Sequence, residues 1–133
     1  KLFLFCLSLH SMKLSLQEMH QMGMNVVGKH LQENDYEFLA VKSDLGQSPQ
    51  FICLKNEKEL FFVLVRTVVF PRDPIAYDQK WMNKMKQHAI DNKARLLYAG
   101  IGLADSNEMM SELEKGKESI VNYQGLLEIS LTI

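Results

Sequence analysis

Histidine and cysteine are the side chains of this sequence best suited to bind a metal or act as a nucleophile, and their spacing favours neither role. No two histidines are separated by the i, i+4 spacing that places two ligands on one helix face. The four histidines are His10, His20, His30 and His88. Cys6 and Cys53 do not form a Cys-x-x-Cys pair, and Cys53 falls in an apolar stretch where a thiol is usually buried and inert. We therefore expect no metal and no cofactor.

A group of basic residues near the second predicted helix is the candidate anion-binding surface. These residues are Lys80, Lys84, Lys86, Lys93 and Arg95. Two acidic residues, Asp78 and Asp91, lie in the same stretch, which leaves a local surplus of three positive charges. Runs of this kind more often form a solvated helix face than a binding site, so both interpretations stay open.

Three helices are expected from capping signals. Ser15 and Glu18 have the Ser-x-x-Glu spacing of a capping box, and an apolar face with helical spacing follows to about Asn34. Gly23 lies inside this helix, which suggests close approach of another backbone. The second helix is predicted from Asp78 to about Asn92, and the third from Asp105 to Gly116.

The strands are expected between these helices. The predicted strands cover residues 36–42, 50–54, 59–69 and 95–103, with one or two more in residues 119–133. Residues 60–65, LFFVLV, are apolar without alternation, as in a central strand that is covered on both faces. A strand that follows a helix favours a parallel crossover. The order predicts an α/β three-layer sandwich in which helices flank a mixed sheet.

Length and charge limit the classes of function. With 133 residues, 15 basic and 16 acidic, the chain is expected to be a single domain over residues 1–133 without a field that attracts nucleic acid. Leu2–Leu9 is apolar but too short to cross a bilayer, so no membrane partner is expected. The default location is the cytoplasm, and an export signal is the alternative. Residues 1–11 are either an atypical N-terminal strand or precede a natural start at Met12.

One resemblance to a known fold follows from the element order and from residues 22–39, MGMNVVGKHLQENDYEFL. Gly23, Leu31, Tyr36 and Leu39 lie where small Holliday-junction-resolvase-like proteins have their helix and first strand. The chain thus resembles the restriction-endonuclease-like, or PD-(D/E)XK, nucleases, with an α-β-β-β-α-β core followed here by a helix and a strand. The resemblance implies a metal-dependent phosphodiesterase site on the second and third strands.

The positions that the resemblance assigns to catalysis lack the required groups. The Asp that heads the second strand of the family corresponds to Gln50 or Phe51, and its Glu-x-Lys to Leu64-Val65-Arg66. The Glu on the first helix corresponds to Met24 or Asn25. Because a divalent cation needs anionic oxygen ligands, the degenerate site at Met24, Asn25, Gln50, Leu64 and Arg66 predicts no hydrolysis. Arg66 is always charged and could hold a phosphate.

Three hypotheses remain. The preferred one is a catalytically inactive, nuclease-like domain that acts by binding or by assembly, including as a homodimer. The second is an active metal-dependent endonuclease or nucleic-acid-binding protein, in which a shift of register brings Asp44 or Glu59 into the site. The third is a structural or protein-interaction module of unrelated α/β fold, in which Leu2–Leu9 and Leu126–Ile133 pair between subunits.

Overall fold

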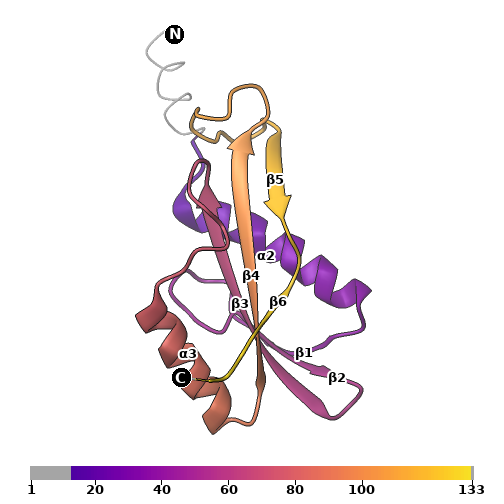
Figure 1. The fold of residues 1–133 in the computed structure, drawn as a ribbon. Coiled ribbons are helices and arrows are strands. Elements are labelled where there is room, and N and C mark those ends of the chain that lie inside the picture. Colours follow the sequence, from indigo (N-terminus) through magenta and orange to yellow (C-terminus); the bar gives the residue numbers. More distant parts are fainter. Residues whose placement is uncertain (1–12, 133) are drawn as a thin grey trace, which may run out of the picture.

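The computed structural model describes residues 13–132, which form two helices and a six-stranded sheet (Figure 1). The elements are α2 (Leu16–Glu33), β1 (Glu37–Val41), β2 (Phe51–Lys55), β3 (Glu59–Val69), α3 (Gln79–Asp91), β4 (Arg95–Asp105), β5 (Ser119–Tyr123) and β6 (Leu127–Ile129). The predicted order of a helix, three strands, a helix and a strand is confirmed. The predictions for residues 1–11, including the strand at Leu2–Leu9, lie outside the described residues.

The sheet is mixed, and its centre is the pair β3 and β4. The strands are arranged in the order β1-β2-β3-β4-β5, and β6 pairs with β4 further along the same side. Only β3 and β4 are parallel, from Phe61 opposite Arg95 to Val69 opposite Leu103. The crossover through α3 therefore has the predicted form. Within the segment that the third hypothesis assigned to intersubunit pairing, β6 pairs with β4 of its own chain, and the proposed partner Leu2–Leu9 lies outside the described residues.

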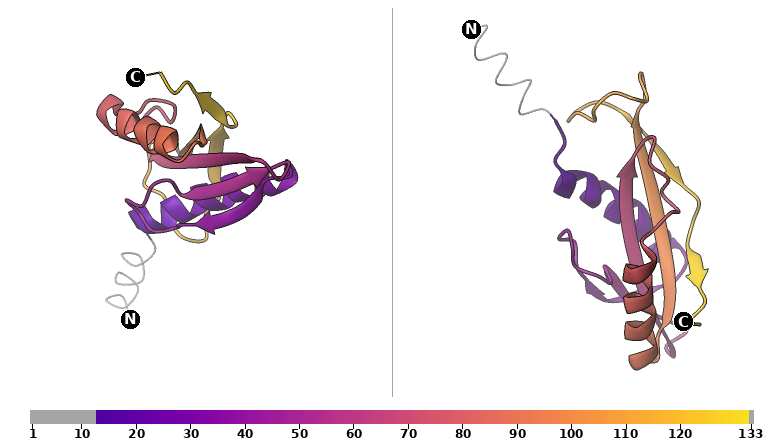
Figure 2. Two further views of the ribbon diagram at one scale, coloured as in Figure 1. Left: turned by 90° about the horizontal axis from the view of Figure 1, so that it is seen from below. Right: turned by 60° about the vertical axis from the view of Figure 1, so that its left-hand side comes forward.

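One helix covers each face of the sheet (Figure 2). Helix α2 packs Met24, Val27 and Leu31 against alternate residues of β2, β3 and β4. Helix α3 packs Met82 and Ala89 against the residues that point to the other face. Strands buried on both faces lack alternation, which explains the continuous apolar run in β3. The α/β three-layer sandwich is confirmed at this level.

Both helices begin at the predicted caps. The Ser15 hydroxyl accepts a hydrogen bond from the Glu18 amide at 3.1 Å, and the Glu18 carboxylate accepts one from the Ser15 amide at 2.9 Å. The Asp78 carboxylate accepts a hydrogen bond from the Trp81 amide at 3.2 Å, which fixes the first turn of α3. Among residues 13–132, neither helix has the length and hydrophobicity that a membrane crossing requires.

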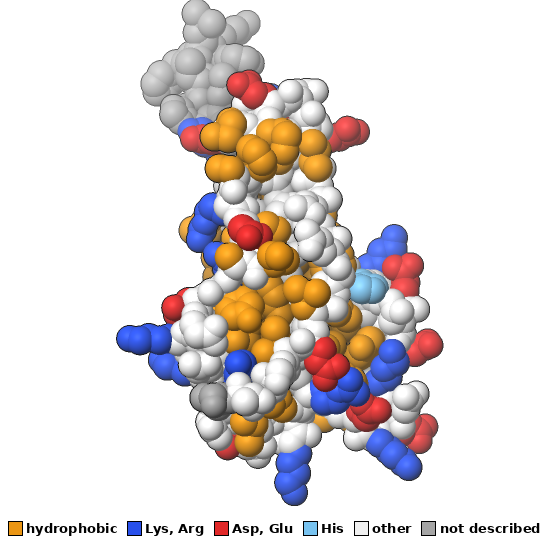
Figure 3. Space-filling model, in the orientation of Figure 1, with side chains coloured by type: hydrophobic (Ala, Val, Ile, Leu, Met, Phe, Trp, Pro, Cys, Tyr) orange, Lys and Arg blue, Asp and Glu red, His pale blue; other side chains and the backbone are white. Residues whose placement is uncertain are grey.

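The predicted third helix, from Asp105 to Gly116, is wrong. The Asp105 carboxylate accepts from the amides of Asn107 and Glu108, as a helix cap does, but the chain continues as turns. The Leu14 amide donates to the Leu113 carbonyl at 3.0 Å, so this backbone pairs with a distant segment instead of its own next turn. Short helices are easily outcompeted in this way because nucleation is costly. Met109 and Met110 are exposed in these turns. Figure 3 shows hydrophobic side chains on this face of the molecule.

Two glycines in β4 differ sharply in the space around them. A Cβ atom at Gly100 would lie 2.1 Å from the Pro74 carbonyl oxygen, whereas one at Gly102 would have its nearest neighbour, Pro74 Cγ, at 3.4 Å. The same carbonyl of Pro74 accepts a hydrogen bond from the Tyr98 hydroxyl at 2.7 Å. Gly100 thus allows the segment after β3 to lie directly on the sheet.

Substitution of these two glycines tests the packing. We expect Gly100→Ala to lower the free energy of unfolding by roughly 1–3 kcal/mol, since backbone must move to admit the methyl group. The matched control Gly102→Ala, with an ordinary contact distance, is expected to cost less. Urea unfolding of both variants measures the difference, and equal losses would contradict the close approach at Pro74.

Candidate functional site

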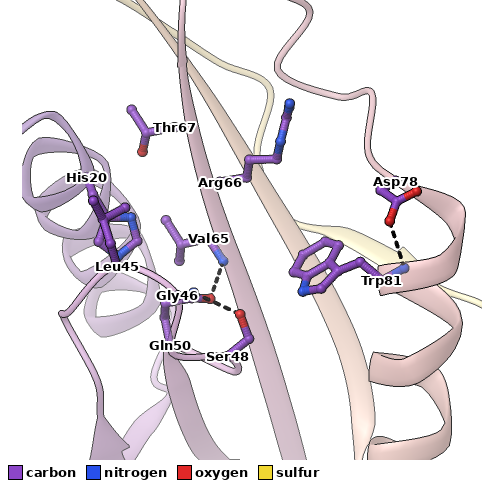
Figure 4. Close-up of a pocket in the computed structure, with 10 residues that line it drawn as sticks. All are labelled: His20, Leu45, Gly46, Ser48, Gln50, Val65, Arg66, Thr67, Asp78 and Trp81. Atoms are coloured by element: carbon purple, nitrogen blue, oxygen red, sulfur yellow. Dashed lines mark hydrogen bonds between the residues drawn. The ribbon is translucent and has the colours of Figure 1, made fainter. Parts of the chain in front are cut away.

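A cleft lies beside β3 just before β2 begins. Phe51, the first residue of β2, pairs with Val63, whereas β3 continues to Val69. The side of β3 that faces β2 therefore has no neighbouring strand from Val65 onward. A cavity of about 340 Å³ opens there between α2, the loop before β2, β3 and α3 (Figure 4). Its lining residues are His20, Leu45, Gly46, Ser48, Gln50, Val65, Arg66, Thr67, Asp78 and Trp81.

The Gln50 side chain satisfies the backbone amide of Val65 on the edge of β3 that has no neighbouring strand. Its Oε1 accepts from the Val65 amide at 2.8 Å, and its Nε2 donates to the Ser48 hydroxyl at 3.1 Å. Gln50 is only 4% exposed, so its amide needs these partners. The side chain takes the place of the next residue of a strand, and its position in the cleft is fixed.

Arg66 holds the segment that leads into α3. Its Nη1 donates to the carbonyl oxygens of Asp73 at 3.3 Å and Ala76 at 2.7 Å. A guanidinium has five N–H donors in all, so further donors remain on a side chain that lines the cleft. The one carboxylate in the lining, Asp78, caps α3. Arg66 and Asp78 together leave the lining without a net charge when His20 is neutral.

Two polar atoms in the lining have no hydrogen-bond partner. Within residues 13–132, His20 Nε2 and Thr67 Oγ1 are the two buried side-chain atoms in this state, and both residues line the cleft. A buried polar atom without a partner costs about 1–3 kcal/mol, so the pair is unfavourable for folding alone. Burial lowers the pKa of His20 below its ordinary value, and the imidazole is neutral near pH 7.

Gly23 explains how Thr67 reaches this position. A Cβ atom at Gly23 would lie 1.9 Å from Thr67 Oγ1, so the glycine is needed for α2 to pack over β3. The close approach predicted at Gly23 exists, but it involves the side chain of Thr67 and not another backbone.

The structure brings together two of the five residues of the predicted degenerate site. Gln50 and Arg66 line the cleft, whereas Leu64 is fully buried against α3. Met24 is in the core beneath α2, and Asn25 is exposed and accepts a hydrogen bond from Gln21 at 2.9 Å. The Gln50 side chain contacts Val65 and not Leu64. It accepts a hydrogen bond from the Val65 amide at the edge of β3.

The acidic residues considered for a shifted register lie elsewhere. Glu59 forms an ion pair with Arg95, which also pairs with Glu128, at the opposite end of β3. Asp44 is exposed in the loop before β2 and does not line the cleft. No group of three His, Cys, Asp or Glu side chains that could hold a metal occurs in the described part of the chain.

The candidate anion surface on α3 is only partly available. Lys80 and Lys84 are exposed, but Lys86 Nζ donates to the Thr132 carbonyl at 3.0 Å. Arg95 is engaged by its two glutamates. Among these basic residues and Arg66, only Arg66 contributes to the cleft.

Sequence reasoning missed His20 and Thr67. A signal for His20 was present, because it shares the helical spacing of the buried residues Met24, Val27 and Leu31. This spacing places His20 on the buried face of α2. His30 is only half-buried and bonds through Nδ1 to the Tyr123 hydroxyl at 2.7 Å.

Comparison with known proteins gives one match. The model of a family described as a domain of unknown function, DUF8840, matches residues 17–129. The match extends from the first turn of α2 to the end of β6, so it includes every residue of the cleft. Neither curated proteins nor solved structures gave a match.

The neutral state of His20 predicts a dependence of stability on pH. The unfolded chain takes up a proton near pH 6.5, whereas the folded chain resists protonation of the buried ring. Protonation of the unfolded chain therefore lowers the free energy of unfolding as the pH falls below 6.5, whereas above pH 6.5 the buried His20 causes no such loss. We expect the free energy of unfolding to fall more steeply from pH 7 to pH 5 in the wild type than in His20→Gln. Parallel curves from urea unfolding would contradict burial of a neutral imidazole.

Thr67→Val tests the unpartnered hydroxyl. The substitution keeps the shape of the side chain and removes the buried oxygen, so we expect the free energy of unfolding to rise by roughly 1 kcal/mol. Thr132→Val, at an exposed position outside the cleft, is the matched control and should change it by less than about 0.5 kcal/mol. Thermal and urea unfolding give the values, and destabilisation by Thr67→Val would show that the hydroxyl is satisfied in the protein.

Proposed function

The chain belongs to the DUF8840 family, and we propose that it is a nuclease-like α/β domain that binds a ligand in the cleft and does not hydrolyse phosphodiesters. The observation that carries this proposal is the cavity of about 340 Å³ beside the free edge of β3, where Arg66, with guanidinium donors to spare, lies in the same lining as the neutral polar side chains of Gln50 and Ser48. A cavity of this size is within the range of small-molecule sites, and an arginine in its lining can hold an anionic group of a ligand.

The topology supports the nuclease-like part of the proposal. A helix precedes an antiparallel β1-β2-β3 unit, and α3 then connects β3 to the parallel strand β4. This is the α-β-β-β-α-β arrangement that the resemblance to PD-(D/E)XK proteins implies. The cleft lies at the start of β2 and the middle of β3, where the resemblance places the phosphodiesterase site.

The chemistry of the lining supports the absence of hydrolysis. Metal-assisted hydrolysis needs several anionic oxygens to hold a divalent cation and polarise the attacked phosphate. In the cleft, an amide stands at Gln50 and a hydrocarbon at Val65, and the single carboxylate, Asp78, is used as a helix cap. His20 and Thr67 are neutral hydrogen-bonding groups. Such a lining favours recognition over hydrolysis.

A cleavage assay tests the proposal. Purified protein is incubated with duplex, branched and single-stranded DNA in magnesium or manganese, and we expect no products above those of a no-protein control. Asp78→Asn is the matched variant, because asparagine also caps helices but removes the only anion of the lining. Cleavage that disappears in Asp78→Asn, or in variants of Asp44 or Glu59, would establish the opposing hypothesis of an active nuclease.

A further inference from the structure

We propose that two copies of this chain associate through the outer edge of β5, whose strands pair antiparallel so that the two sheets become one. The inference goes beyond the proposed function and does not depend on the cleft. It combines three properties of β5: a free hydrogen-bonding edge, exposed apolar side chains on both of its faces, and a sequence that can pair with itself.

The backbone of β5 has hydrogen-bonding groups that no strand of the described residues uses. β5 is the last strand in the order of the sheet, and β4 is its neighbour on one side (Figure 1). The Ser106 amide donates to the Glu118 carbonyl at 3.2 Å, and successive residues of an antiparallel strand bond to alternate sides. Counted from Glu118, the even-numbered residues of β5 bond toward β4. The amides and carbonyls of Ser119, Val121 and Tyr123 therefore point outward.

The opposite edge of the sheet, at β1, is irregular. Phe38 pairs with Cys53 and Ala40 with Ile52, so Leu39 is the extra residue of a bulge. A bulge twists an edge strand and disrupts regular pairing with another chain. β5, by contrast, keeps a continuous register with β4 and contains no charged residue, proline or glycine. Of the two edges, β5 is the one suited to accept a strand.

β5 exposes apolar side chains on both faces. Ile120 and Val121 are each 44% exposed, and neighbours along a strand point to opposite faces. The exposed side chains of Phe70 and Met109 line a cavity of about 160 Å³ together with Ile120, so the apolar surface continues from the edge onto the sheet. Pairing with a second strand removes apolar area from water, which favours association.

The outer edge of β5 is complementary to itself. When a two-fold axis passes through Val121, this residue lies opposite its own equivalent, and Ser119 lies opposite Tyr123 of the second copy. Every outward-pointing residue of the strand then has an outward-pointing partner, and each pair exchanges both of its N–H···O bonds. A shift of the axis by one residue leaves one of them without a partner in the strand.

The charges favour a second copy as the occupant of this edge. In the symmetric register, Lys117 lies opposite Gly125 and Glu118 opposite Gln124, so like charges do not face each other across the pair. The whole chain has a net charge of −1, so two copies repel each other only weakly. A two-fold interface uses the same surface on both molecules, and this surface already meets that requirement.

The oligomeric state tests the inference, and Val121→Lys is the variant that addresses its centre. We expect the mass of the wild type, from light scattering or sedimentation, to rise with concentration toward twice the 15.3 kDa of the chain. A five-residue strand makes a small interface, so the expected Kd is roughly 1–100 µM. Val121→Lys places two ammonium groups opposite each other and should weaken the dimer at least about tenfold. The matched control Leu39→Lys, at an exposed position in the middle of β1, should dimerise like the wild type.

An exchange of charge tests the register. Val121→Glu alone should also be monomeric, whereas an equimolar mixture of Val121→Lys and Val121→Glu should form a heterodimer, because the two side chains lie opposite each other. Hydrogen exchange of the wild type gives a readout that needs no substitution. The amides of Ser119, Val121 and Tyr123 should gain protection as the concentration rises, and those of Ile120 and Asn122 should be protected at every concentration.

Three results would overturn the inference. The first is a wild type that stays monomeric up to about 1 mM. The second is a dimer that Val121→Lys does not weaken while circular dichroism shows the variant to be folded. The third is protection of the Ser119, Val121 and Tyr123 amides at every concentration, since the edge is then covered within one chain. The cleavage assay tests the proposed function separately, and none of these results bears on it.

Discussion

The parallel pairing of β3 with β4 is the constraint on which the rest of the structure depends. Both strands have eleven residues, and their register continues from Phe61 and Arg95 to Val69 and Leu103. Parallel neighbours cannot be joined by a tight turn, so the chain must cross over, and α3 provides that crossover. Two buried faces then require two covering layers, which α2 and α3 supply.

The cleft follows from unequal strand lengths beside this central pair. β2 has five residues and begins opposite Val63, so the second half of β3 has no strand beside it on that edge. Gln50 covers the first amide of that edge, and the residues beyond it face a cavity. His20 and Thr67 line the cavity from α2 and β3, and Trp81 lines it from α3. Three elements whose positions are fixed by the core thus meet at one site.

The sequence was a good guide wherever a local signal had a local effect. The caps at Ser15 and Asp78 depend on neighbours in the chain, and both formed. The apolar run of β3 also predicted burial on both faces, which α2 and α3 supply for residues 61–65. The prediction of the third helix was wrong because an aspartate that caps a helix and one that stabilises a turn give the same signal in the sequence. The distant backbone pairing between Leu14 and Leu113 determines that this segment forms turns.

The site was harder to predict than the fold, for a geometric reason. Counting along β3 places Leu64 in register with Gln50, but Gln50 bonds to the Val65 amide and turns toward the free edge. His20 and Thr67 are far apart in sequence and line the same cavity because α2 packs closely over β3, where Gly23 lies against Thr67. The helical and strand periodicities of the sequence do not predict this arrangement. Only the buried spacing of His20 with Met24 and Val27 indicated its role.

The two residues that precede β2 also affect the tendency to aggregate. An uncovered strand edge can recruit a strand from a second molecule, and proteins commonly guard such edges. Pro49 has no amide hydrogen to continue the ladder, and the adjoining glutamine side chain occupies the position that an incoming strand would take. The gap beside β3 is therefore guarded against strand addition by its own two flanking residues, while space remains for a molecule much smaller than a polypeptide.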